Sequence, residues 1–364
     1  MVHLRILLGA ALTALSNASS LTTVPQYIKD SGLPRLSWKL LSTGSKAQFR
    51  GLAPVSDKVA WVSGTNGTVL RTTNGGESWT PVGPSLSLED AGLEFRDIEA
   101  WSVHKAVILS IGEGTDSRIY STKDGGATWT RSFTNREATA FYDCVAFENP
   151  RHGMAMSDPV DGKFRLIETF DGGETWDIVD PAGMAPALDG EAGFAASGTC
   201  LETAAGRWYI ASGGIDPGRI FRSVDGHRWE VSNSSIAGGA AGGVFSVRFR
   251  DARHGIAVGG DFQAPGGAVN NAAWSQDGGK TWIRATSFPD GYRSGSSWVQ
   301  GLLHTAIAVG PTGSDFTVDG GRTWHGFDNG TFDSVECLRG AVCWASGQGG
   351  RVARLSLRGN ERSM

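Results

Sequence analysis

The chain lacks an excess of charge of either sign. Its 364 residues contain 33 Lys and Arg against 37 Asp and Glu, and the formal net charge is −4. Proteins that bind nucleic acid through its phosphates usually carry a strongly basic face. The composition therefore predicts no nucleic-acid partner.

A long apolar segment is also missing. The run ILLGAALTAL at 6–15 is about half as long as a membrane-spanning helix, and no later run is long enough, so we expect no membrane span. Basic residues precede the run and small residues follow it, as in a secretory signal peptide. We predict a signal over 1–18, an extension over 19–35 and a secreted protein. In a eukaryotic host, N-glycosylation is then expected at the sequons of Asn66, Asn233 and Asn329.

Cysteine is scarce, with four residues and no C-x-x-C or Cys/His spacing typical of zinc sites. No G-x-G-x-x-G motif opens a helix after a strand, so neither a metal nor a cofactor is predicted. Cys337 and Cys343 flank a short turn and are expected to form a disulfide across a hairpin. Cys144 and Cys200 occupy equivalent positions of a repeat, which leaves open whether they form a second disulfide or two buried thiols.

Glycine (52 residues) and tryptophan (13 residues) are abundant, and they recur in one phrase. TTNGGESW, STKDGGATW, TFDGGETW, SVDGHRW, SQDGGKTW and TVDGGRTW each end at a tryptophan, at intervals of 42 to 53 residues. The acid or amide can accept hydrogen bonds from nearby backbone N–H groups, and the glycines allow a positive φ. We assign a structural role to these turn residues: Asn74, Asp124, Asp171, Asp225, Asp277 and Asp319.

The interval between the phrases is the length of a four-stranded propeller blade. The three strands before the phrase occur seven times, but the last copy lacks its fourth strand. The segment LSWKLLS at 36–42 resembles an isolated fourth strand. The prediction is an all-β, seven-bladed β-propeller of four-stranded blades over 36–357, closed by the N-terminal strand, with a tail at 358–364. A closed ring has no free sheet edge, so we expect a monomer.

The phrase Ser/Thr-x-Asp-x-Gly-x-Thr-Trp resembles the Asp box of BNR/sialidase-type propellers. The segments FRGL…VAWVSGTNGTVLRTTNGGESW and FRDIEAW…STKDGGATW are most similar to the branch of photosystem II stability/assembly factor-like proteins. This resemblance implies a seven-bladed binding scaffold. The sialidase Phe-Arg-Ile-Pro signature is absent, because FRDI at 95–98 has Asp where Ile is expected.

Four of the seven histidines fall in equivalent turns between the first and second strands, which indicates turn chemistry. The loops on the opposite face, between blades and between the second and third strands, differ from one another and are the predicted binding surface. There we predict a site for an extracellular glycan or protein partner, with arginines for an acidic group. Its predicted residues are Arg50, Arg96, Asp161, Glu191, Asn270, Asn271, Tyr292 and Arg293.

Two alternatives stay open. Each arginine could pair with a nearby acid, such as Arg96 with Asp97 or Glu191, and only join the blades. The protein could also be a glycoside hydrolase or polysaccharide lyase that acts on an acidic sugar. The catalytic candidates for that reaction are Tyr142, Asp158 and Asp261.

Overall fold

A computed structural model describes residues 35–357. This part is a single compact unit. The predicted signal peptide, nearly all of the extension and the C-terminal tail lie outside the described residues. No helix in 35–357 is both long and apolar enough to cross a membrane.

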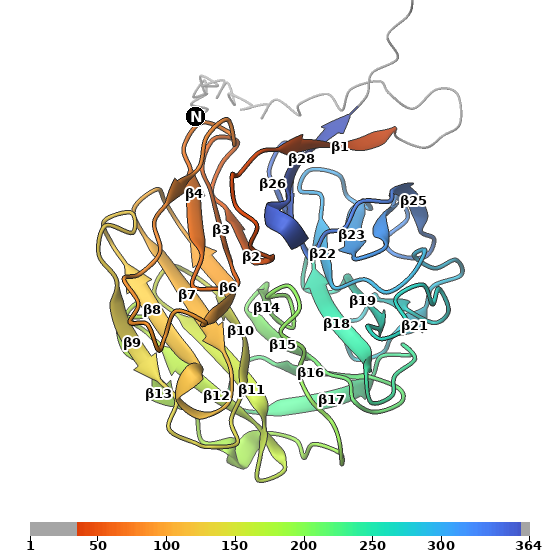
Figure 1. The fold of residues 1–364 in the computed structure, drawn as a ribbon. Coiled ribbons are helices and arrows are strands. Elements are labelled where there is room, and N and C mark those ends of the chain that lie inside the picture. Colours follow the sequence, from red (N-terminus) through yellow and green to blue (C-terminus); the bar gives the residue numbers. More distant parts are fainter. Residues whose placement is uncertain (1–34, 358–364) are drawn as a thin grey trace, which may run out of the picture. The chain divides into compact units, whose positions relative to one another are not determined.

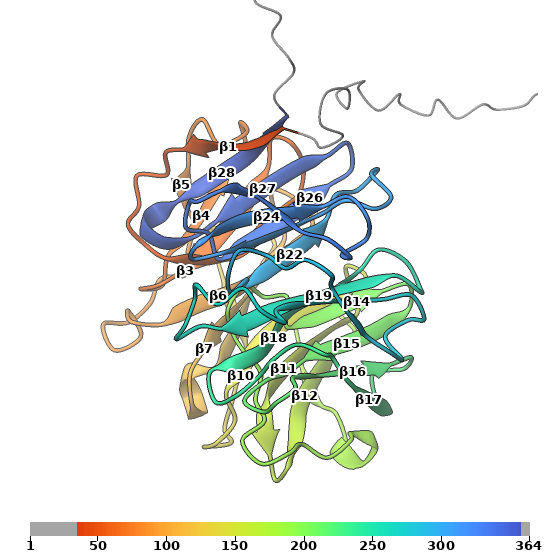
Figure 2. The same cartoon turned by 90° about the vertical axis from the view of Figure 1, so that its right-hand side faces the viewer.

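Twenty-eight strands form seven antiparallel sheets of four strands each, arranged as the blades of a propeller (Figures 1 and 2). Blade 1 contains β2 (Phe49–Pro54), β3 (Ala60–Gly64), β4 (Val69–Thr72) and β5 (Thr80–Pro81). Blade 2 contains β6 (Glu94–Ala100), β7 (Ala106–Ile111), β8 (Arg118–Thr122) and β9 (Thr130–Thr134). Blade 3 contains β10 (Tyr142–Phe147), β11 (Gly153–Val160), β12 (Lys163–Thr169) and β13 (Asp177–Ile178). Blade 4 contains β14 (Leu201–Ala204), β15 (Arg207–Ala211), β16 (Arg219–Ser223) and β17 (Trp229–Asn233).

The remaining blades follow the same order. Blade 5 contains β18 (Gly242–Phe249), β19 (Gly255–Asp261), β20 (Ala272–Ser275) and β21 (Ile283–Arg284). Blade 6 contains β22 (Gly295–Trp298), β23 (Ala306–Gly310), β24 (Gly313–Thr317) and β25 (His325–Asp328). Blade 7 contains β26 (Ser334–Leu338), β27 (Val342–Ser346), β28 (Val352–Leu357) and β1 (Leu36–Leu41). The short 3-10 turns are η1 (Gly114–Asp116), η2 (Pro181–Gly183) and η3 (Gln348–Gly350).

The N-terminal strand closes the ring, as the sequence predicts. β1 pairs antiparallel with β28, from Leu36 opposite Leu357 to Leu41 opposite Val352, and the two strands lie side by side in both views (Figures 1 and 2). Trp38 is nearly buried, and its Nε1 donates a hydrogen bond to Ser314 Oγ of blade 6 at 2.9 Å. The seven-bladed architecture is therefore confirmed.

The repeated turn is held by its own side chains. Asp171 Oδ1 accepts hydrogen bonds from Thr169 Oγ1 and from the backbone N–H groups of Glu174 and Thr175, and Oδ2 accepts one from Thr175 Oγ1. Burial opposes ionisation, but these hydrogen bonds outweigh it and lower the pKa of Asp171 to about 2. Gly172 has a φ of 82°, which a residue with a side chain rarely adopts. The acid therefore stabilises the turn.

Both disulfides are present. Cys337 and Cys343 face each other across the β26–β27 hairpin, and Cys144 of β10 bonds to Cys200 just before β14. The second bond ties blade 3 to the entrance of blade 4. The three sequon asparagines are exposed, and their glycosylation stays a prediction.

Candidate binding site at the axial mouth

The innermost strands of four blades carry β-bulges at the same level. The pairing register shifts between Phe49 and Gly51 in β2, and equivalent shifts occur in β6, β10 and β18. A bulge leaves one residue outside the regular alternation and redirects its side chain. The bulged residues of the four strands are Arg50, Arg96, Asp143 and Phe245.

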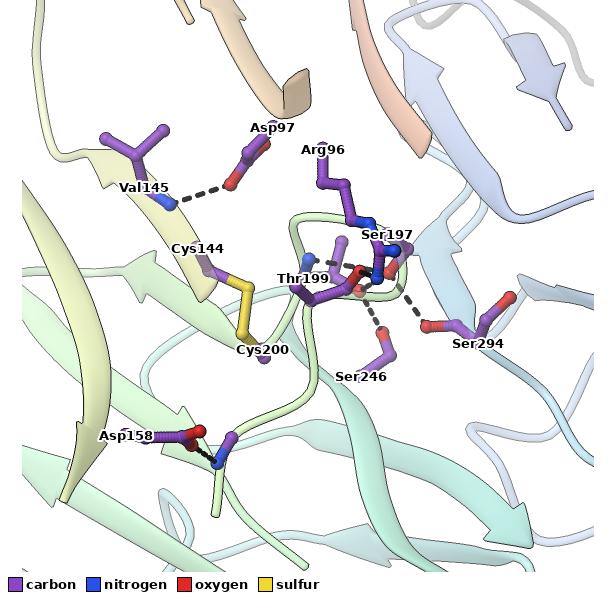
Figure 3. The surroundings of a disulfide bond; sticks show 12 residues. Arg96, Asp97, Cys144, Val145, Asp158, Ser197, Thr199, Cys200, Ser246 and Ser294 are labelled. Carbon is purple, nitrogen blue, oxygen red and sulfur yellow. Dashed lines mark hydrogen bonds between the residues drawn. A yellow bond between two sulfur atoms is a disulfide. The ribbon is translucent and has the colours of Figure 1, made fainter. Parts of the chain in front are cut away.

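The loop 192–199, which we call the axial loop, crosses the centre of the propeller before β14 (Figures 1 and 3). Gly193 N–H donates to Asp158 Oδ1 of blade 3 at 2.7 Å, and Arg96 Nη1 of blade 2 donates to the Ala195 carbonyl at 3.4 Å. Farther along, Ser197 Oγ donates to the carbonyl of Ser294, at the entrance of blade 6, at 2.7 Å. Thr199 Oγ1 donates to Ser246 Oγ of blade 5 at 2.8 Å. The loop is therefore fixed on several sides, and Cys200 fixes its end.

We call the group formed by Arg50, Arg96, Asp143 and Asp158 the axial mouth. Arg50 and Arg96 are both partly exposed there. Arg50 Nε lies 3.7 Å from an oxygen of Asp333, and Arg96 Nε donates to Glu94 Oε2 at 2.8 Å. Burial and the positive charge of Arg50 lower the pKa of Arg96, although Glu94 opposes the shift. Each of the two arginines therefore pairs with a nearby acid, as the alternative expected, but the partner of Arg96 is Glu94 and not Asp97 or Glu191.

Two carboxyl groups of the mouth have a raised pKa. Asp143 is 2% exposed, and burial followed by the charge of Asp158 raises its pKa well above the ordinary range, while Arg96 opposes the shift. Burial raises the pKa of Asp158 to about 6, against the hydrogen bond from Gly193. Asp143 Oδ2 is buried and has no hydrogen-bond partner among residues 35–357. A buried polar atom without a partner is uncommon and requires an explanation.

Several predicted site residues are buried in structural contacts. Arg293 is 1% exposed, and its Nε donates to Asp315 Oδ2 of β24 at 2.5 Å. Asn271 is fully buried, and its Nδ2 donates to the Gly291 carbonyl at 2.7 Å. Glu191 accepts a hydrogen bond from Arg219 Nε at 2.9 Å. These groups hold loops in place and do not face solvent.

The two predicted tyrosines are also buried. Tyr142 packs edge-on against Phe133, and burial raises its pKa, so the hydroxyl is not poised for acid/base chemistry. Tyr292 packs edge-on against Phe245, with ring centroids 4.6 Å apart, and burial raises its pKa as well. The surroundings of Tyr142 do not favour its predicted catalytic role, and the Tyr292 side chain is buried.

Three further predicted residues lie in turns. Asp161 is exposed in the β11–β12 turn with a φ of 52°, and Asn270 has a φ of 53°. Asp261 is exposed at the end of β19, where its Oδ1 accepts a hydrogen bond from Gln263 N–H at 2.8 Å. Asp158 and Asp261 belong to blades 3 and 5, and no hydrogen bond or ion pair of the described chain joins them. Of the predicted residues, the structure brings together Arg50, Arg96 and Asp158.

A cavity of about 110 Å³ contains a charged cluster that the sequence reasoning missed. Arg248 donates to Glu202 at 3.0 Å and to Glu336 at 2.6 Å. Burial and the charge of Glu336 raise the pKa of Glu202 to about 7, against Arg248. Burial likewise raises the pKa of Asp97 to about 7. The acidic cavity, as we call it, is lined by Asp97, Glu99, Glu202, Arg248 and Glu336.

A signal for this cluster exists in the sequence. Glu99, Glu202, Arg248 and Glu336 lie on the innermost strands of four blades. Charged side chains that point inward from the innermost strands of a small ring lie near its axis, whichever blade carries them. In residues 35–357, no group of three or more His, Cys, Asp or Glu side chains has an arrangement that could hold a metal ion.

The described chain is a seven-bladed β-propeller. No family model matches the chain, and no curated protein matches it. Its fold is similar to that of YCF48 bound to a D1 peptide, with a TM-score of 0.61 and 14% identity over 87% of this chain and 96% of that one. YCF48 from Cyanidioschyzon merolae gives the same score and identity over 87% and 98% of the two chains. A GH74 enzyme from Niastella koreensis gives a TM-score of 0.59 and 14% identity over 86% of this chain and 53% of the enzyme.

Proposed function

We propose that this protein is a secreted scaffold that binds a polypeptide partner at the axial mouth. The observation that carries the proposal is the pair of partly exposed arginines on neighbouring bulges. Burial and the charge of Arg50 lower the pKa of Arg96, so the two like charges are unfavourable to each other. A carboxylate of the partner that contacts both arginines would relieve this repulsion and form charge-assisted hydrogen bonds.

Two further observations support a binding role. The axial loop contacts blades 2, 3 and 5 and is tied by the Cys144–Cys200 disulfide. The surface is therefore preorganised, and little conformational entropy is lost when a partner binds. The structurally similar YCF48 has been solved with a D1 peptide bound. A glycan ligand remains the alternative within the same site.

The test compares three forms of the purified protein: wild type, Arg50→Ala/Arg96→Ala, and Arg151→Ala. Arg151 is an exposed arginine of the β10–β11 turn, and it serves as the matched control. Peptides that bind each form are selected from a displayed library of random dodecapeptides. The affinities of the enriched peptides are then measured by isothermal titration calorimetry. We expect acidic peptides to bind wild type and Arg151→Ala equally and the double variant at least tenfold more weakly. Equal binding by all three forms, with unchanged melting temperatures, would disprove the proposal.

A second candidate is the carbohydrate-active enzyme. The Asp143–Asp158 pair favours it, because two perturbed carboxyl groups are typical of acid/base sites, and the fold is similar to that of a GH74 enzyme. The same proteins are therefore incubated with acidic polysaccharides, and reducing ends and unsaturated uronate absorbance are measured. Turnover that is lost in Asp158→Asn but kept in Asp261→Asn would favour the enzyme over the scaffold.

A further inference from the structure

Next to the arginines, four aromatic rings pack together into a cluster, which we call the aromatic shelf; Phe262 and Phe194 are its exposed and partly exposed rings, and Phe245 and Tyr292 are buried beneath them. Phe194 of the axial loop stacks on Phe245, with ring centroids 4.0 Å apart and planes 9° apart. Phe262, in the loop after β19, lies edge-on to both rings at 6.2 and 6.3 Å. Tyr292 packs on the other side of Phe245. Phe262 remains 47% exposed although it contacts a buried aromatic cluster.

The shelf and the arginines belong to one surface. Phe194 lies between Gly193, which donates to Asp158, and Ala195, which accepts from Arg96. On the other side, Tyr292 is close enough to Arg50 for the arginine's charge to act on its hydroxyl. The axial loop therefore carries an apolar ring directly beside the charged groups of the mouth. A ligand that reaches Arg96 is at most a few residues of extended chain away from Phe262.

We propose that the aromatic shelf is a second subsite, which binds a large apolar or aromatic side chain of the partner polypeptide. The partner is then a segment in which such a side chain lies within about four positions of a carboxylate. The carboxylate comes from an acidic side chain or from a chain terminus. This inference rests on the proposed function and adds the identity of the recognised segment.

The chemistry of the shelf favours a peptide over a sugar. Three of its four rings are phenylalanines without a polar atom, and the Tyr292 side chain is buried. A sugar ring presents hydroxyl groups that need hydrogen-bond partners when water is removed. An aromatic or aliphatic side chain has no such requirement, and an exposed phenylalanine on a rigid support is a typical anchor contact for it.

The test uses the same dodecapeptide library on four forms of the full chain: wild type, Phe262→Ala, Arg50→Ala/Arg96→Ala, and Phe170→Ala. Phe170 is 60% exposed in the repeated turn of blade 3, outside the mouth, and serves as the matched control. With wild type and Phe170→Ala, we expect enrichment of peptides that pair a large apolar residue with a nearby acid. With Phe262→Ala the acid preference should persist while the apolar preference disappears, and binding of a wild-type-selected peptide should weaken at least fivefold.

Peptides synthesised with a free or an amidated C-terminus, and with Glu changed to Gln, identify the source of the carboxylate. If Phe262→Ala selects the same sequences as wild type while the arginine variant loses binding, the second subsite is wrong and the proposed function stands. If neither variant changes the selection, both proposals fail. Enrichment of glycans but not peptides on a parallel array would also overturn the shelf's assignment. Thermal unfolding of each variant shows whether it is folded.

Discussion

At the scale of single residues, several carboxyl groups near the axis of the propeller have a raised pKa. Burial raises the pKa of Asp97 and Glu202 to about 7 and that of Asp158 to about 6. These carboxyl groups bind a proton more tightly in the folded chain than in the unfolded chain, where the pKa values of aspartate and glutamate are near 4. Their stabilising contribution is therefore complete below about pH 4 and is lost as the pH rises towards 7.

We expect the free energy of unfolding to fall by about 5–7 kcal/mol between pH 5 and pH 8, because these three pKa values lie about 2, 2 and 1 units above pH 5 and one unit corresponds to about 1.4 kcal/mol. Glu99→Gln should reduce this fall. Burial and the charge of Asp97 raise the pKa of Glu99 well above its ordinary range, and no hydrogen bond or ion pair to it forms within residues 35–357. Urea denaturation of both proteins at several pH values measures the effect. Parallel pH profiles would contradict it.

The repeated turns respond in the opposite direction. Asp171 and Asp225 have their pKa lowered to about 2 by hydrogen bonds of the turn, which prevail over burial. Their contribution is present above about pH 4 and is lost as the pH falls towards 2. Together with the axial carboxyl groups, this places the highest stability at mildly acidic pH.

Arg293 was predicted from the sequence to bind a ligand, but in the structure it is buried and forms an ion pair with Asp315. Arg293→Ala should lower the free energy of unfolding by about 3–5 kcal/mol, because it leaves Asp315 buried without its partner. Arg293→Ala/Asp315→Ala should be less destabilised than the single variant, since no charge then remains buried. Chemical denaturation measures both. A single variant as stable as wild type would contradict this account.

At the scale of elements, the sequence predicted the features that depend only on neighbouring residues or on a count of strands. The repeated turn is local: Thr169, Asp171 and Thr175 lie within seven residues, so their hydrogen bonds follow from the phrase itself. The closing strand was predictable because LSWKLLS lacked a partner and the last blade lacked a strand. Both inferences needed only neighbours or a count of strands.

The site depends on contacts that no repeat reveals. Ser197 meets Ser294 and Arg96 meets Ala195, each pair almost a hundred residues apart. Arg96 is the bulged residue inside β6 and is partly exposed, whereas Arg293 precedes β22 and is buried against Asp315. The Asp143–Asp158 pair likewise depends on how β10 and β11 present their ends to the axial loop.

The tryptophans of the repeated turn differ in burial and therefore in importance. Trp324 is buried against Ile256 and Val258 of blade 5, whereas Trp176 is only partly buried against its neighbouring blade. Trp324→Ala should lower the free energy of unfolding by about 3–5 kcal/mol, through lost burial and the cavity left behind. Trp176→Ala should cost clearly less. Guanidinium denaturation of the two variants is the measurement, and equal losses would show that exposure does not determine the contribution.

At the scale of the whole described chain, one strand holds the ring closed. β1 gives β28 its second neighbour, and without it the last blade would end in an exposed edge. Trp38 is the main apolar contact of this strand, with Phe327 of blade 6 and Phe332 at ring-centroid distances of 5.8 and 5.4 Å. Closure therefore joins blade 7 to blade 6 as well as the start of the propeller to its end.

Trp38→Ala should therefore destabilise both paired strands of the closure, β1 and β28. We expect a loss of about 3–5 kcal/mol in the free energy of unfolding and faster amide hydrogen exchange in β1 and β28 together. Leu40→Ala is the matched control, because Leu40 is 54% exposed in the same strand and should change stability by less than about 1 kcal/mol. If β1 exchanges faster in Trp38→Ala while β28 keeps its protection, β28 does not depend on the closing strand, and blade 7 is stable with three strands alone.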